Sequence, residues 1–110
     1  NQIDSEKKLF SFLKKVKQIS NNLILEVEID EIKYLETSIE AGADAVLLDN
    51  FTPEEVKSAV SINENRIVLE ASGGITLNSI EKFAIAKPHF ISSGAPVHSS
   101  RWIDIGLDWK

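Results

Sequence analysis

Polar residues that could bind a sugar, a cation or a phosphate recur along this chain, each at the end of an apolar run. Glu28, Asp49, Glu70 and Ser92 close four such runs at spacings of 21, 21 and 22 residues. In a parallel α/β barrel the strands bring their carboxyl ends to one rim, where the active sites of these proteins lie. The spacing therefore predicts that these four residues meet on one rim.

Two of these carboxylates, Glu28 and Asp49, are candidate ligands of a cation or of sugar hydroxyls. They end neighbouring predicted strands, and Glu26 shares the face of Glu28 because side chains alternate along a strand. Mg²⁺ is a hard cation that suits a few carboxylates together with substrate oxygens. The alternative is structural, because buried carboxylates need partners and these could pair with Lys or Arg across the sheet.

Glycine-bearing turns follow the last two predicted strands, as Ser72-Gly73-Gly74 and as Ser92-Ser93-Gly94. Glycines let backbone N–H groups approach an anion closely, and the N-terminus of a following helix favours negative charge. Neighbouring turns of this kind on late strands are typical of barrel phosphate sites. We predict a phosphate site at Ser72, Gly73, Gly74, Ser93 and Gly94, with tight βα turns as the alternative.

The histidines and tryptophans add weaker candidates. His98 could contact the phosphate or transfer a proton, or it could be an ordinary loop histidine, whereas His89 is predicted to be structural. Trp102 and Trp109 stand in a tail that alternates as an edge strand does, and we expect them to pack against another domain or subunit. Glu70 could be a buried, paired carboxylate.

Apolar patterning predicts the elements that position these residues. Strands are expected over residues 23–28, 45–49, 66–70 and 89–92, as nearly continuous apolar runs typical of a parallel sheet. Helices are expected before and between them, starting at Asp4 or Ser5, around Ile32, at Thr52-Pro53-Glu54-Glu55 and at Thr76, with Gly42 ending the second. Right-handed crossovers allow an open doubly wound sheet or an arc of a barrel, and the short, even units favour the barrel.

Composition excludes several classes of function. The net charge of −5 argues against nucleic-acid binding, and the lysines of the first helix are expected to form a solvated face. No apolar run approaches about 18 residues, so no membrane span is expected. There is no cysteine, which excludes disulfides and thiolate metal sites. We expect a cytoplasmic protein that binds small molecules.

Taken in order, these segments resemble the C-terminal half of the quinolinate phosphoribosyltransferase (nicotinate-nucleotide pyrophosphorylase, carboxylating) family. The resemblance covers the chain from Leu23 onward. The matching segments are Leu25-Glu26-Val27-Glu28, Ala41-Gly42-Ala43-Asp44, Leu47-Leu48-Asp49-Asn50, Glu70-Ala71-Ser72-Gly73-Gly74-Ile75, Ile91-Ser92-Ser93-Gly94-Ala95 and Ile103-Asp104-Ile105-Gly106-Leu107-Asp108. It implies that residues 1–110 are the C-terminal half of the α/β-barrel domain, without the N-terminal domain and the first barrel strands.

The resemblance also implies an activity and roles for particular residues. The family condenses quinolinate with phosphoribosyl pyrophosphate, giving nicotinate mononucleotide, pyrophosphate and carbon dioxide for NAD synthesis. Glu28 and Asp49 would be the catalytic acidic pair near ribose and Mg²⁺, stabilising the positive charge on the sugar as pyrophosphate leaves. Ser72, Gly73 and Gly94 would hold the phosphate, and His98 matches the family's histidine after the last barrel strand.

Three positions depart from the family pattern. Ser93 stands where a small aliphatic residue is usual, Pro96 replaces a common Leu, and Gln2 replaces His. A site for two anionic substrates also needs Arg and Lys, yet no predicted strand here ends in a base. By the resemblance, the bases lie in the first barrel strands and in the N-terminal domain of a partner subunit. We therefore expect a homodimer or larger homo-oligomer at full length, and no transferase activity from this chain alone.

Three alternatives stay open. The chain could belong to a related phosphoribosyltransferase-like protein with another acceptor, such as nicotinate, or to a molybdenum-associated homologue. It could be a phosphate-binding barrel of the isomerase or aldolase type. It could also be a non-catalytic half-barrel that self-associates through its exposed sheet edges.

Overall fold

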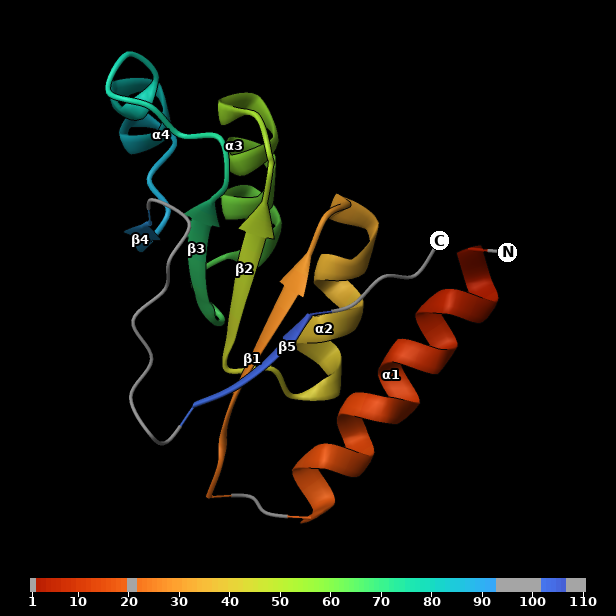
Figure 1. Ribbon diagram of the computed structural model, residues 1–110. Helices are drawn as coiled ribbons and strands as arrows, with labels where there is room; N and C mark the ends of the chain where they lie inside the picture. Colours follow the sequence, from red (N-terminus) through yellow and green to blue (C-terminus); the bar gives the residue numbers. More distant parts are fainter. Residues whose placement is uncertain (1, 20–21, 93–101, 107–110) are drawn as a thin grey trace.

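The computed structural model describes residues 2–19, 22–92 and 102–106, and it is built around one parallel sheet (Figure 1). The strands follow the order β4-β3-β2-β1-β5 across the sheet. The elements in chain order are α1 (Gln2–Ile19), β1 (Ile24–Ile29), the 3₁₀ turn η1 (Ile32–Tyr34), α2 (Leu35–Ala41), β2 (Ala45–Asp49), α3 (Pro53–Asn63), β3 (Val68–Ser72), α4 (Ile80–Ile85), β4 (Phe90–Ile91) and β5 (Trp102–Gly106).

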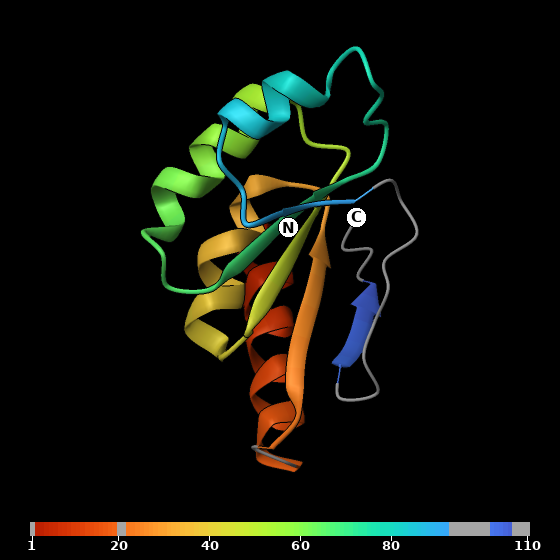
Figure 2. The same ribbon diagram turned by 90° about the vertical axis from the view of Figure 1, so that its left-hand side faces the viewer.

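The α-helices of the described residues, α1 to α4, cover the same face of the sheet, as Figure 2 shows. Strands β1 to β4 lie in sequence order, each paired in parallel with the next. A doubly wound sheet would carry helices on both faces. The arrangement is therefore an arc of a barrel wall, and the predicted α/β fold with barrel-like units is confirmed.

The strand register divides the sheet residues between two faces. Val27 pairs with Val46, which pairs with Leu69, and all three are fully buried under the helices. One residue further along, Glu28 pairs with Leu47, which pairs with Glu70. Because neighbouring side chains on a strand point to opposite faces, Glu28 and Glu70 lie on the face that bears no helix, which we call the open face.

Local signals set the helix ends well in two cases and poorly in two others. Thr52 and Glu55 form the predicted capping box, with Pro53 in the first turn of α3, and Gly42 ends α2 in the left-handed conformation at φ 105°. The predicted start of the first helix at Asp4 or Ser5 is wrong, because α1 begins at Gln2.

The fourth helix is a second correction. Thr76 does not cap it, because Ser79 occupies the N-cap position of α4. The backbone carbonyl of Thr76 accepts hydrogen bonds from Ser79 N and Ile80 N, so a separate turn stands between Gly74 and the helix.

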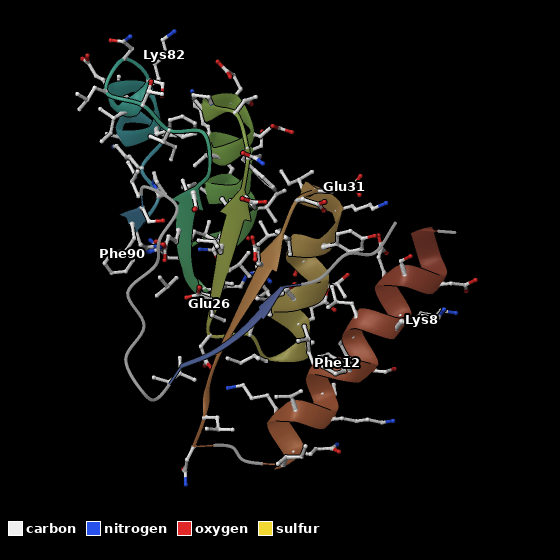
Figure 3. All side chains as sticks on the ribbon, in the orientation of Figure 1. Lys8, Phe12, Glu26, Glu31, Lys82 and Phe90 are labelled. Carbon is white, nitrogen blue, oxygen red and sulfur yellow. The ribbon has the colours of Figure 1, made fainter. Side chains whose placement is uncertain are left out.

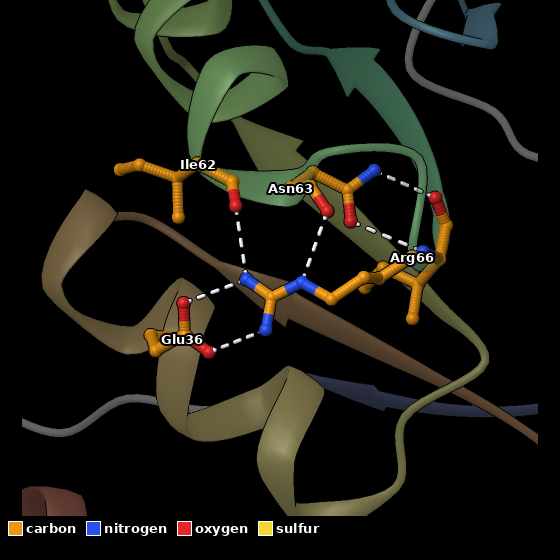
Figure 4. Close-up of polar contacts among 5 residues, drawn as sticks. Glu36, Ile62, Asn63 and Arg66 are labelled. Atoms are coloured by element: carbon orange, nitrogen blue, oxygen red, sulfur yellow. Dashed lines mark hydrogen bonds and ion pairs between the residues drawn. The ribbon is translucent and has the colours of Figure 1, made fainter.

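The third strand begins and ends two residues later than predicted, because side chains hold residues 66 and 67 in the preceding turn (Figure 4). Asn63, which is buried, donates from Nδ2 to Ile67 O at 2.7 Å and accepts from Ile67 N at 3.1 Å. Arg66 donates to the Glu36 carboxylate on α2 at 2.7 and 2.8 Å. The Arg66 hydrogen bond holds the pKa of the Glu36 carboxyl below its ordinary value.

Lys17 of α1 contacts the turn before β2, at Gly42 and Asp44. Asp44 Oδ2 accepts from Leu25 N at 2.7 Å and from Lys17 Nζ at 2.6 Å. A Cβ on Gly42 would lie 3.4 Å from Cγ of Lys17. The absence of a side chain on Gly42 therefore leaves room for the Lys17 side chain to reach Asp44. Asp44 thus supports the fold at the amino ends of the strands, away from the predicted rim.

The two edge strands differ in length. The predicted tail strand is present as β5, which pairs in parallel with β1 from Ile24↔Trp102 to Glu28↔Gly106. At the other edge, β4 has two residues, and Phe90 is 60 % exposed there (Figure 3). Among the described residues, no helix is long and apolar enough to span a membrane.

Candidate functional site

The candidate site lies on the open face, at the carboxyl ends of β2 and β3. Asp49 is the last residue of β2 and the register partner of Ser72, the last residue of β3. The carboxylate is half-buried, and Ser72 is buried. The sequence prediction that Asp49 and the serine–glycine turn meet at one rim is therefore met by the geometry.

Gly73 packs directly against the Asp49 carboxylate. A Cβ on Gly73 would lie 2.8 Å from Asp49 Oδ1 and 2.7 Å from Asn50 Oδ1, closer than side chains pack. Gly73 and Gly74 have φ values of 83° and 67°, where residues with a Cβ are strained. Glycine is required here both by conformation and by space, because the Asp49 and Asn50 side-chain oxygens and the Asn50 backbone N leave no room for a Cβ.

Asn50 is the residue at this rim to which the sequence assigned no role. Its φ is 58°, and its backbone N–H donates to Ser72 O at 2.9 Å, which ties the end of β2 to the end of β3. The sequence could have indicated this role, because an Asn directly after a predicted strand is well suited to the left-handed conformation of a turn.

Glu28 lies on the same face of the sheet as Asp49, further from the carboxyl ends of the strands. It is half-buried on β1, where it pairs with Leu47, two residues before Asp49. Glu70 also pairs with Leu47 and therefore lies at the same height as Glu28. The strands β1 and β3, which were predicted to end at these two glutamates, extend one and two residues beyond them. Neither Asp49 nor Glu70 forms a salt bridge within the described residues.

The described carboxylates do not form a complete metal cage. No group of three His, Cys, Asp or Glu residues that could hold a metal ion occurs in the described part of the chain. Mg²⁺ commonly binds through one or two carboxylates together with waters and substrate phosphates. Glu28 and Asp49, on one face of adjacent strands, are compatible with that sparse arrangement.

A cavity of about 400 Å³ opens beside the glycine turn, between residues 75–80 and the end of β4. Its walls are mainly apolar, from Ile75, Leu77, Ile80 and Ile91. Ser92 also lines it, and the Ser92 hydroxyl oxygen is buried without a hydrogen-bond partner among the described residues.

The remaining predicted residues divide into two groups. Ser93, Gly94, His98 and Trp109 lie outside the described residues, and the phosphate site as a whole stays a prediction. His89 lies at the opposite end of the sheet, where its Nδ1 accepts from Leu69 N at 3.0 Å, as expected for a structural residue.

Comparison with known proteins identifies the family. The family model described as quinolinate phosphoribosyl transferase, C-terminal domain, matches residues 1–108. The chain belongs to this family.

Two named members of the quinolinate phosphoribosyltransferase family are 36 and 38 % identical to the chain over the residues that align. It is 38 % identical over 96 residues to the probable nicotinate-nucleotide pyrophosphorylase [carboxylating] of Bacillus subtilis, covering 86 % of the chain and 33 % of that protein. The human nicotinate-nucleotide pyrophosphorylase [carboxylating] is 36 % identical over 88 residues, covering 77 % of the chain and 30 % of the human protein. The chain thus spans about a third of the length of these curated relatives.

Solved structures of the family agree. The nicotinate-nucleotide pyrophosphorylase from Francisella tularensis superposes with a TM-score of 0.69 at 41 % identity, over 74 % of the chain and 29 % of that structure. A structure named QR15, an aldolase, has a TM-score of 0.66 at 24 % identity over 80 % of the chain and 47 % of that structure, which is a likeness of fold alone.

Proposed function

We propose that this chain supplies the phosphate- and ribose-binding rim of a quinolinate phosphoribosyltransferase. In that reaction quinolinate and phosphoribosyl pyrophosphate give nicotinate mononucleotide, pyrophosphate and carbon dioxide. The observation that carries the proposal is the contact of the Asp49 carboxylate with the Gly73 turn at the carboxyl ends of adjacent strands. A phosphorylated sugar presents both a phosphate and hydroxyl groups, and this rim offers backbone groups for the first and a carboxylate for the second.

Asp49 and Glu28 have distinct tasks in this proposal. Asp49, beside the glycine turn, accepts hydrogen bonds from ribose hydroxyls and stabilises positive charge that develops on the sugar. Glu28 lies on the same face, two residues further from the carboxyl ends of the strands than Asp49, and its charge adds to the negative potential of Asp49. Both would hold Mg²⁺, which supplies charge neutralisation for the pyrophosphate group when bound.

The acceptor side of the reaction lies with other residues. The open face carries the carboxylates Glu28, Asp49 and Glu70, and neither Asp49 nor Glu70 forms a salt bridge within the described residues. A dianionic acceptor needs convergent bases, so we propose that the remainder of a whole, cytoplasmic enzyme supplies them, from its own chain and from a second copy. The chain alone is then a binding rim without turnover.

Calorimetric titration with phosphoribosyl pyrophosphate and Mg²⁺ tests the rim. We expect the chain to bind the ligand, and Asp49→Asn to weaken binding at least about tenfold because a charge-assisted hydrogen bond and a Mg²⁺ ligand are lost. Glu81→Gln removes a charge from an exposed position on α4 and serves as the control. Equal losses in both variants, or no binding by the unmodified chain, would contradict the proposal.

A turnover assay tests the second half of the proposal. With quinolinate, phosphoribosyl pyrophosphate and Mg²⁺, the chain is expected to release no pyrophosphate above the uncatalysed rate. Release at the rate of a full-length relative would show that the missing bases are not needed.

A further inference from the structure

Asn50 joins the two strand ends that form the candidate site. It is an exposed residue directly after β2, in the left-handed conformation at φ 58°. Its N–H donates to Ser72 O at 2.9 Å, one step beyond the register pair Asp49↔Ser72. The turn after β2 is therefore fixed to the turn after β3 at the point where the ladder ends.

The side chain of Asn50 lies over both glycines. Its Oδ1 is 2.7 Å from the position that a Cβ on Gly73 would occupy, and 3.5 Å from the corresponding position on Gly74. Asp49 Oδ1 is 2.8 Å from the same point on Gly73. A neutral amide and a carboxylate thus flank one short stretch of exposed backbone.

This pairing resolves an electrostatic conflict in a phosphate site. A phosphate that approached the Gly73–Gly74 backbone would meet the negative Asp49 carboxylate, and like charges at such distances repel. An amide carries no net charge, and a half-turn about its last bond exchanges its acceptor for a two-proton donor at the same place. The donor can then bind a phosphate oxygen, and the same group can donate to the carboxylate.

We propose that Asn50 is a positioning residue for a phosphate group: its backbone locks the glycine turn to β2, and its amide separates the phosphate from the Asp49 carboxylate. This inference rests on the phosphate site of the proposed function. It assigns to Asn50 a role in binding the anionic group, in addition to its place in the turn.

Substitutions at Asn50 and Asn65 separate the amide from the turn. Asn65 is also exposed and left-handed, at φ 59°, but it precedes β3 at the other end of the strand. Gly adopts positive φ without strain, so Asn50→Gly keeps the backbone and removes the amide. Asn50→Asp keeps the shape and adds a charge, and Asn65→Gly and Asn65→Asp repeat both changes away from the site.

The measurement is a titration of the ¹⁵N-labelled chain with inorganic phosphate, followed by the amide signals of Gly73 and Gly74. Phosphate is expected to shift both signals in the unmodified chain. Asn50→Gly is expected to raise the dissociation constant about three- to tenfold and Asn50→Asp more than about tenfold, with both Asn65 variants unchanged. Thermal unfolding by circular dichroism confirms that each variant is folded.

The outcomes distinguish this inference from the proposed function. If phosphate shifts the two signals in the unmodified chain and equally well in both Asn50 variants, Asn50 has no positioning role and the phosphate site stands. If the Asp variants at residues 50 and 65 weaken binding equally, a general charge effect replaces the proposal. If the unmodified chain shows no shift, the phosphate site and the inference fail together.

Discussion

Replacing Gly73 by Ala tests the packing of the site most directly. The substitution places a Cβ at 2.7 Å from Asn50 Oδ1 and 2.8 Å from Asp49 Oδ1. An Ala at positive φ costs about 1–2 kcal/mol, and overpacking of this kind adds about 1–3 kcal/mol. The expected loss in the free energy of unfolding is therefore about 2–5 kcal/mol, a large share of the roughly 5–15 kcal/mol typical of a domain.

Gly74→Ala is the matched control. It has a similar φ of 67°, yet its Cβ would lie 3.5 Å from Asn50 Oδ1, which is ordinary contact. It should lose only the conformational part, about 1–2 kcal/mol. The difference between the two variants measures the contact of Gly73 with the two side-chain oxygens.

Urea unfolding followed by circular dichroism gives both values. In the double variant Gly73→Ala/Asn50→Gly one of the two overlapping oxygens is gone, so part of the loss should be recovered, with a coupling of about 1 kcal/mol. If Gly73→Ala and Gly74→Ala differ by less than about 0.5 kcal/mol, the side chains of Asp49 and Asn50 do not lie over Gly73, and the geometry of the site is refuted.

Three further predictions concern the supports of the fold. Asn63→Ala removes the side-chain partner of the backbone N–H and C=O of half-buried Ile67. It is expected to cost about 1–3 kcal/mol in urea unfolding, against less than about 0.5 kcal/mol for a substitution at the exposed Asn65. Asp44→Asn weakens the ion pair with Lys17 and is expected to cost about 1 kcal/mol, a difference that high salt should reduce. The Arg66 hydrogen bond lowers the pKa of Glu36 from its ordinary 4.5. The stabilisation of the folded state by this pair is therefore complete above pH 4.5 and is lost as the pH falls through the lowered pKa. Glu36→Gln should flatten this acid limb in unfolding measurements between about pH 5 and 3, and an unchanged slope would show that the pair contributes nothing.

Local chemistry was readable from the sequence wherever one short segment decides the structure. The start of α3 depends on Thr52, Pro53 and Glu55, which all stand within four residues, and the structure has the predicted cap. The left-handed end of α2 at Gly42 is of the same kind. Continuous apolar strands joined by helices likewise indicated a parallel sheet, because both faces of such strands are largely enclosed.

Contacts between distant segments decided what the sequence could not. The late start of β3 follows from Asn63 and from the pairing of Arg66 with Glu36, thirty positions away, and no local pattern encodes that pairing. The site was predicted in part for the same reason. Asp49 and Gly73 were named separately, whereas the contact of Asn50 with Gly73 beside Asp49 depends on the register of β2 against β3.

The alternation of side chains across this sheet has a consequence for how its sequence can change. A slip of β2 by one residue against its neighbours would turn Asp49 toward the helices and Val46 and Leu48 toward the open face, so a single change of register would disrupt core and site together. Substitutions on the open face, by contrast, leave the helix-covered core intact. The face that carries the proposed site and the face that maintains the fold can therefore diverge independently, and a barrel wall of this kind can acquire another specificity without rebuilding its interior.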